Sequence, residues 1–86
     1  MKIEDKVIKI AMAISKPIEI LELSSHTYNS LRRWGIYSIY ELLEWRERGQ
    51  LAKIRGIGGK ALIEIDHEIE SYLKDKGLWE DNNDTR

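Results

Sequence analysis

The sequence predicts an all-α fold, a compact bundle of about five short helices that contains a helix-hairpin-helix. Apolar residues recur at helical spacing in several segments of the 86-residue chain. Capping residues and glycines mark the ends of these segments, and one glycine-rich stretch joins two of them. Hydrophobic residues make up 42% of the chain and charged residues 34%, which is typical of one small soluble globular domain.

Residues 1–16 are expected to form an N-terminal amphipathic helix, whose apolar residues are 4, 3 and 4 positions apart: Ile3, Val7, Ile10 and Ile14. Pro17 disfavours helix at the preceding residue and so ends the element. We expect the apolar stripe to dock on the domain's own core. The spacing is also heptad-like, so a seam with a partner helix, or a homodimer through residues 3–14, stays open.

The next helical segment is marked at both ends. A short extended segment, 18–23, leads to Ser24 and Ser25, either of which offers an N-cap. The helix that follows should end at Gly35, which suits the left-handed residue after a helix.

A second set of end signals defines the third helix. Ser38 and Glu41 are three residues apart, as in a capping box, and Gly49 follows where the helix should close. A single turn at 51–54 then precedes the glycine-rich hairpin.

The last helix begins after the hairpin and should bury one apolar stripe: Leu62, Ile65, Ile69 and Leu73. Gly77 ends it, and residues 79–86 read as a polar tail. The expected organisation is therefore an N-terminal helix (1–16), a helix-hairpin-helix domain (17–78) and a tail (79–86).

The stretch 51–65 is the candidate functional site. Its three glycines, which allow positive φ and leave the backbone uncovered, are Gly56, Gly58 and Gly59. A helix that begins just after them directs free N–H groups and a positive dipole end outward, which suits a phosphate. Arg55 and Lys60 bracket the turn with positive charge. The pattern predicts a module that binds nucleic-acid backbone without reading bases; alternatively, the glycines only make a tight turn.

Net charge argues against a strongly basic DNA-binding surface. The chain has 14 Lys and Arg against 15 Asp and Glu, a formal net charge of -1. Strong DNA binders are usually basic overall, although a local basic patch can act while acidic residues occupy another face.

Other function classes find little support. The chain has no cysteine, which excludes disulfides and cysteine-based zinc sites and is consistent with an intracellular setting. No apolar run approaches the roughly 18 residues of a membrane span. His26 and His67 fall on different predicted helices, and no Ser-His-Asp or metal-ligand spacing occurs. We therefore expect no enzyme activity, cofactor or metal.

Three segments together resemble a known family. They are 21–32, 36–42 and 51–65, and their most specific parts are an Asn-x-Leu-Arg step at 29–32 and an Ile-Gly-x-Lys-Ala-x-x-Glu-Ile run at 57–65. Over roughly residues 17–78 the chain resembles the C-terminal domain of the bacterial RNA polymerase α subunit, a fold similar to SAM domains. The chain is then a stand-alone relative or an excised domain, and its N-terminal helix, unlike the family's flexible linker, favours the former.

The resemblance implies a cytoplasmic, nucleoid-associated domain. It would bind the minor groove of A+T-rich DNA and contact RNA polymerase, σ factor or a transcription regulator. Asn29 matches a DNA-contacting asparagine and Arg32 a basic backbone contact. Gly58 and Lys60 match hairpin contacts, and Ala61 replaces a small hydroxyl residue that usually helps bind phosphate.

His26 is the main departure from the family, which usually has arginine there to enter the minor groove. Histidine is shorter, only partly protonated near neutral pH, and lacks the planar donor fork. Two hypotheses follow: a weak DNA-binding module, or a protein-interaction module of the same fold with little DNA affinity. His26, Ala61 and the acidic side of the last helix favour the second, although we expect most of these acids to form a solvated face: Glu64, Asp66, Glu68 and Glu70.

Overall fold

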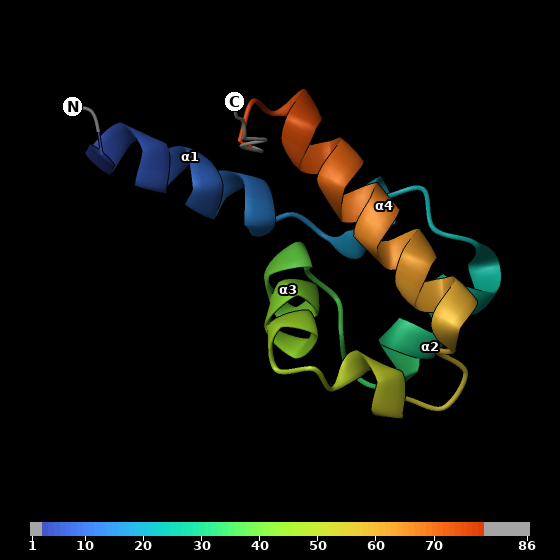
Figure 1. The fold of residues 1–86 in the computed structure, drawn as a ribbon. Coiled ribbons are helices and arrows are strands. Elements are labelled where there is room, and N and C mark those ends of the chain that lie inside the picture. The colour runs from blue at the N-terminus through green and yellow to red at the C-terminus, as the bar shows by residue number, and fades with distance from the viewer. Residues whose placement is uncertain (1–2, 79–86) are drawn as a thin grey trace, which may run out of the picture.

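The structure is a computed structural model that describes residues 3–78. Within these residues the protein is entirely helical apart from loops and one isolated β-bridge, which confirms the predicted all-α class (Figure 1). The α-helices are α1 (Ile3–Ile14), α2 (Ser25–Arg33), α3 (Ile39–Glu47) and α4 (Gly59–Asp75). Two single 3₁₀ turns, η1 (Ile18–Ile20) and η2 (Leu51–Lys53), complete the described elements. Residues 79–86, expected as a polar tail, lie outside the described part.

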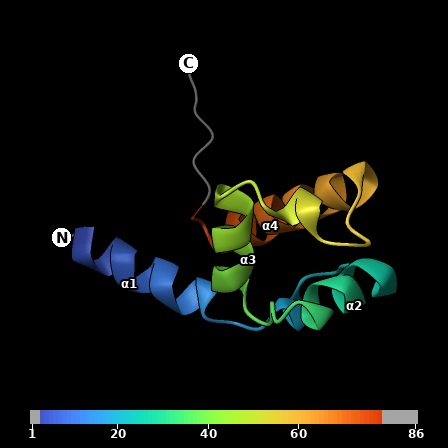
Figure 2. The same cartoon turned by 90° about the horizontal axis from the view of Figure 1, so that it is seen from below.

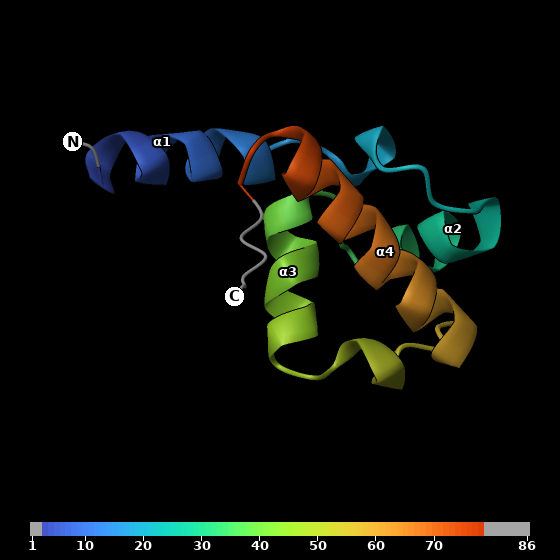
Figure 3. The same cartoon turned by 45° about the horizontal axis from the view of Figure 1, so that its top comes forward.

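A single apolar core joins α2, α3 and α4. Figures 1 and 3 show α4 lying between α2 and α3. The core consists of isoleucine and leucine with one alanine: Ile18, Leu21, Leu31, Ile36, Ile39, Leu42, Leu51, Ile54, Ile57, Ala61, Ile65 and Ile69. The predicted stripe of α4 is therefore buried at Ile65 and Ile69, whereas Leu62 and Leu73 are half-buried at its edge.

The helix ends follow the predicted local signals. Ser24 is the N-cap of α2, and Ser38 with Glu41 forms a complete capping box at α3. Gly35 has φ +81° and lets the N–H groups of Gly35 and Ile36 bond back to the last turn of α2. Gly49 and Gly77 end α3 and α4 in the same way. Local sequence thus defines where each of these helices stops.

Segment 18–23 differs from the extended conformation that we predicted. Ile18–Ile20 forms the 3₁₀ turn η1, in which the Leu21 N–H donates to the Ile18 carbonyl at 3.0 Å. Ile18 is fully buried in the core. Turning the backbone at Ile18 lets two apolar residues three positions apart, Ile18 and Leu21, reach the same core.

Helix α1 does not pack as we predicted. Val7 and Ile10 are 57% and 38% exposed, and only Ala13 is buried, with Ile14 half-buried. Figures 2 and 3 show α1 extending away from the other helices. Docking of the stripe on the domain's own core is therefore wrong for Val7 and Ile10; the side chain of Ile3 lies outside what the structure describes.

The reason lies in how α1 is attached. The Ile39 N–H donates to the Lys16 carbonyl and the Ile18 N–H to the Tyr37 carbonyl, both at 2.9 Å. This bridge fixes the backbone directly after α1, so only the last turn of α1 lies over the domain. A 12-residue helix is about 18 Å long, and its first turns therefore extend past the core.

Candidate nucleic-acid interface

The hairpin between η2 and α4 uses one of its three glycines for backbone geometry. Gly56 has φ +96°, and a Cβ there would lie 2.5 Å from the Ser30 Oγ and 3.6 Å from the His26 Nε2. Gly58 has φ −104°, and Gly59 is the first residue of α4. A Cβ at either of these two positions would meet nothing within 4 Å. Gly56 is therefore required by the fold, while Gly58 and Gly59 leave the surface over the start of α4 open.

No side chain caps the start of α4. Its N-cap is Gly58, and the first backbone bond of the helix runs from the Leu62 N–H to the Gly58 carbonyl at 3.0 Å. The three preceding N–H groups, of residues 59–61, have no acceptor among the described residues. The starts of α2 and α3 are instead capped by Ser24 and Ser38. The start of α4 thus combines free N–H donors with the positive end of a 17-residue helix dipole.

His26 joins the start of α2 to the hairpin. Its Nε2 lies 3.0 Å from the Gly56 carbonyl oxygen, so the ring donates an Nε2–H to that oxygen. The two segments that the family resemblance implicates, 26–32 and 58–61, are therefore brought to one side of the domain. Because Nε2 is occupied by the hairpin, Nδ1 is the ring nitrogen left for other partners.

Three polar side chains near this junction have no hydrogen-bond or ion-pair partner within residues 3–78. Asn29 lies one turn after His26 on α2, Arg55 directly precedes Gly56, and Lys60 is in the first turn of α4. All three are exposed. Arg55 and Lys60 are thus free to interact with an anion at the start of α4.

Arg32 differs, because the fold itself engages its guanidinium. Nη1 donates to Glu19 Oε2 at 3.1 Å and to the Tyr28 hydroxyl at 3.0 Å. The guanidinium carbon also lies 5.5 Å and 5.0 Å from the ring centres of Tyr28 and Tyr37. A hydrogen bond from Tyr28, helped by the charge of Arg32, holds the pKa of Glu19 below its ordinary value. The positive charge of Arg32 is therefore largely balanced within the domain.

Ala61 contributes only its backbone to the surface. Its side chain is 7% exposed and belongs to the core. Any contact from this position to a phosphate must come from its N–H group.

Glu64 connects α2 and α4, a role that the sequence analysis missed. Oε1 accepts from the Thr27 hydroxyl at 2.7 Å and from the Ser24 hydroxyl at 3.2 Å, and Oε2 accepts from the Ser24 N–H. Partial burial raises the pKa of Glu64, but these hydrogen bonds outweigh it and hold the pKa below its ordinary value. The carboxylate thus fixes the start of α2 against α4. The sequence signal that could have pointed to this role is that Glu64 is the glutamate of the Ile-Gly-x-Lys-Ala-x-x-Glu-Ile run at 57–65.

The other acids of α4 stay at least partly exposed, as expected of a solvated face, but each also has a hydrogen-bond or ion-pair partner. Asp66 accepts from Arg46 Nε at 2.5 Å, and Glu70 pairs with Lys74 at 3.2 Å. Glu68 accepts from the Glu22 N–H at 3.2 Å. These acids stabilise the packing of α4 and its own last turns.

Residues 3–78 contain no cluster of three or more histidines, aspartates or glutamates placed to hold a metal ion. Among the same residues, no helix is both long enough and apolar enough to span a membrane.

A comparison with models of known protein families establishes the family of this chain. The model of the C-terminal domain of the bacterial RNA polymerase alpha subunit matches residues 4–71. The protein belongs to this family. The family is a non-catalytic domain of the polymerase, so the protein is a transcription-related domain.

Curated relatives agree with the family. A DNA-directed RNA polymerase subunit alpha of Clostridium botulinum is 39% identical over 70 residues, covering 81% of this chain and 21% of that subunit. The corresponding subunit of Leuconostoc mesenteroides is 37% identical over 67 residues, covering 78% and 21%. That of Desulfitobacterium hafniense is 44% identical over 61 residues, covering 71% and 18%. The sequence thus spans about a fifth of the length of these relatives. No solved structure matches it significantly.

Proposed function

We propose that the protein is a DNA-binding domain that acts in transcription in the bacterial cytoplasm, in contact with the nucleoid. It binds backbone phosphate at the start of α4 and approaches the minor groove with the start of α2. The observation that carries the proposal is the uncapped start of α4, with Arg55 and Lys60 unpaired beside it. Membership of the polymerase α C-terminal domain family supports it.

Each part of the site has a defined task in this proposal. A phosphate accepts hydrogen bonds from the N–H groups of residues 59–61, and the missing Cβ atoms of Gly58 and Gly59 let it approach the backbone. Arg55 and Lys60 supply the neutralising charge. Asn29, with both donor and acceptor groups, faces the acceptors that A·T pairs present in the minor groove.

The binding should be weak and only moderately salt-dependent. One phosphate-sized site with two unpaired cations neutralises one or two phosphates. Since the slope of log K against log salt is about −0.9 per phosphate, we expect a slope of roughly −1 to −2. A slope steeper than roughly −4 would require a much larger basic surface and would contradict this site.

His26 provides the decisive test. His26→Arg should increase affinity for an A+T-rich duplex at both pH 6.0 and pH 7.5, because the narrow minor groove attracts a permanent cation. His26→Ala should bind weakly at both. Fluorescence anisotropy with a labelled duplex measures all three proteins.

A matched control separates local from general charge. His67→Arg adds the same charge on α4, eight residues and about 12 Å along the helix from Gly59. It should leave affinity nearly unchanged. If folded His26→Arg binds no better than the parent, or no better than His67→Arg, DNA binding at this site is refuted.

A second candidate function is a protein contact through α1, for which we propose a second copy of the protein as the partner. Four large apolar side chains are exposed together on this helix: Val7, Ile8, Ile10 and Met12. Asp5 lies near the start of α1, and Lys9 and Lys16 lie toward or just past its end. An antiparallel pair of α1 helices would therefore bring opposite charges together while it covers the heptad-like stripe.

Sedimentation equilibrium tests this contact. The parent should show concentration-dependent dimerisation, and Val7→Glu should be monomeric because a carboxylate would enter the seam. A parent that stays monomeric at millimolar concentration would exclude the homodimer and leave α1 to a different protein, such as polymerase, σ factor or a regulator.

A further inference from the structure

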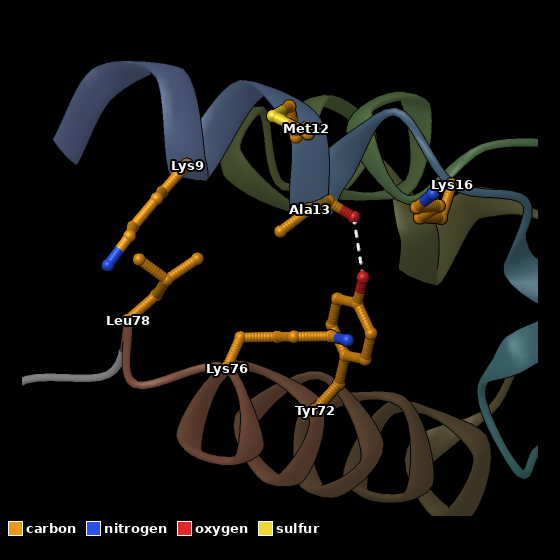
Figure 4. A pocket seen from close by; sticks show the side chains of 7 residues that line it. All are labelled: Lys9, Met12, Ala13, Lys16, Tyr72, Lys76 and Leu78. Atoms are coloured by element: carbon orange, nitrogen blue, oxygen red, sulfur yellow. Dashed lines mark hydrogen bonds between the residues drawn. The ribbon is translucent and has the colours of Figure 1, made fainter. Parts of the chain in front are cut away.

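A groove lies between α1 and the C-terminal end of α4, on the side of the domain away from the hairpin. Figure 4 shows α1 on one side of it and the last turn of α4 on the other. Its volume is about 280 Å³. Its apolar lining comes from Met12, Ala13, Tyr72 and Leu78, and its charged lining from Lys9, Lys16 and Lys76.

The groove is built into the fold. The Tyr72 hydroxyl donates to the Ala13 carbonyl at 2.7 Å and closes one end (Figure 4). Burial raises the pKa of Tyr72, so the hydroxyl stays protonated as the donor. Lys76 Nζ lies 5.6 Å from the centre of the Tyr72 ring. The tyrosine therefore joins the C-terminal part of α4 to the last turn of α1.

Size and charge define what the groove accepts. Its volume is slightly below the roughly 300–1,000 Å³ of typical small-molecule pockets, so it suits one large side chain. All three charged residues of its lining are lysines, and none is an acid. A fitting ligand is a peptide segment with one bulky apolar residue followed by carboxylates.

Such a segment follows the groove directly in the sequence. Leu78 forms part of the lining, and the sequence continues with Trp79, Glu80, Asp81 and, three residues later, Asp84. Residues 79–86 lie outside the described part of the structure. Within them three acids stand against one arginine, a charge opposite to that of the lysines.

We propose that residues 79–86 dock in this groove, with the Trp79 side chain over Met12 and Ala13 and the acids among the three lysines. Tryptophan buries 150–250 Å² when it packs, more than any smaller anchor could in this space. The segment is tethered at Leu78, so its effective concentration at the groove is on the order of millimolar. Weak contacts are then sufficient for occupancy, and docking would join α1 to α4. Lys9, Met12 and Lys16 also belong to the α1 surface of the proposed homodimer, so the two contacts share these residues. The docking uses no residue of the proposed DNA-binding site and is independent of DNA binding.

NMR of the intact protein tests the apolar contact. Trp79→Ala should shift the Met12 methyl and Ala13 amide signals. It should also lower the melting temperature by roughly 4–8 °C, the shift that a loss of about 1 kcal/mol in stability causes in a domain of this size. Trp34→Ala removes a different tryptophan, half-exposed at the end of α2, and should leave both the Met12 and the Ala13 signals unchanged. Far-UV circular dichroism establishes that each variant is folded.

Charge reversal tests the electrostatic contact. Lys9→Glu and Lys16→Glu should each shift the Trp79 indole N–H signal, and Lys53→Glu, which changes an exposed lysine of η2, should not. Raising the salt concentration should weaken the lysine effects. If Trp79→Ala leaves the Met12 signal in place, or if neither lysine reversal moves the Trp79 signal, the proposal is overturned and the groove must accept a different partner.

Discussion

Gly56→Ala should destabilise the domain more than an alanine substitution at any of the other glycines with positive φ, which are Gly35, Gly49 and Gly77. The left-handed conformation at φ +96° costs a residue with a Cβ about 1–2 kcal/mol. The new Cβ would also lie 2.5 Å from the Ser30 Oγ, and Ser30 is 3% exposed, so that hydroxyl has little room to move. Overpacking of this kind typically costs about 1–3 kcal/mol. We therefore expect a loss of about 2–5 kcal/mol in the free energy of unfolding.

Two matched variants separate these contributions in urea denaturation followed by circular dichroism. Gly35→Ala has φ +81° and open space around the new Cβ, so it should lose only about 1–2 kcal/mol. Combining Gly56→Ala with Ser30→Ala removes the hydroxyl and should recover most of the overpacking cost relative to Ser30→Ala alone. If Gly56→Ala costs no more than Gly35→Ala, or if Ser30→Ala recovers nothing, the close contact between the hairpin and α2 is refuted.

Two further predictions concern side chains that join helices. Glu64→Gln should lower stability at neutral pH, because the amide accepts more weakly from Ser24 and Thr27. Folding lowers the pKa of Glu64, so its contribution is present above the ordinary value of 4.5 and is lost as the pH falls below it through the lowered value. The gap between parent and variant should therefore close as the pH falls below 4.5, and a gap of constant size would contradict this. Tyr72→Phe should cost about 0.5–1.5 kcal/mol and speed amide exchange in the last turn of α1, because it removes the bond to Ala13; unchanged exchange there would show that this bond does not hold α1.

Local patterns were enough to predict the helices and their ends. An N-cap or a capping box joins residues three apart, and a terminal glycine acts within one turn, so the capping box of Ser38 with Glu41 and the end at Gly35 could be predicted from the sequence. For the start of α2 the sequence offered Ser24 or Ser25, and the structure has Ser24. The buried stripe of α4 followed from its period in the same way.

Contacts between distant residues could not be predicted. Glu64 bonds to residues 37 and 40 positions away, and His26 bonds to a carbonyl 30 positions away. A carboxylate on an exposed-looking helix face gives no local sign of such a partner. The error at α1 has a similar origin, because an apolar stripe predicts that something will cover it and does not identify what.

The bridge that follows α1 also determines how the domain responds to mechanical load. The backbone of Lys16 and Ile18 is bonded to the loop between α2 and α3, at Ile39 and Tyr37. A pull on α1 is therefore carried by its bond to Tyr72 at the far end of α4 and by these two hydrogen bonds. His26 and Gly56 take part in none of these three hydrogen bonds, so breaking the attachment of α1 leaves the bond between His26 and Gly56 in place.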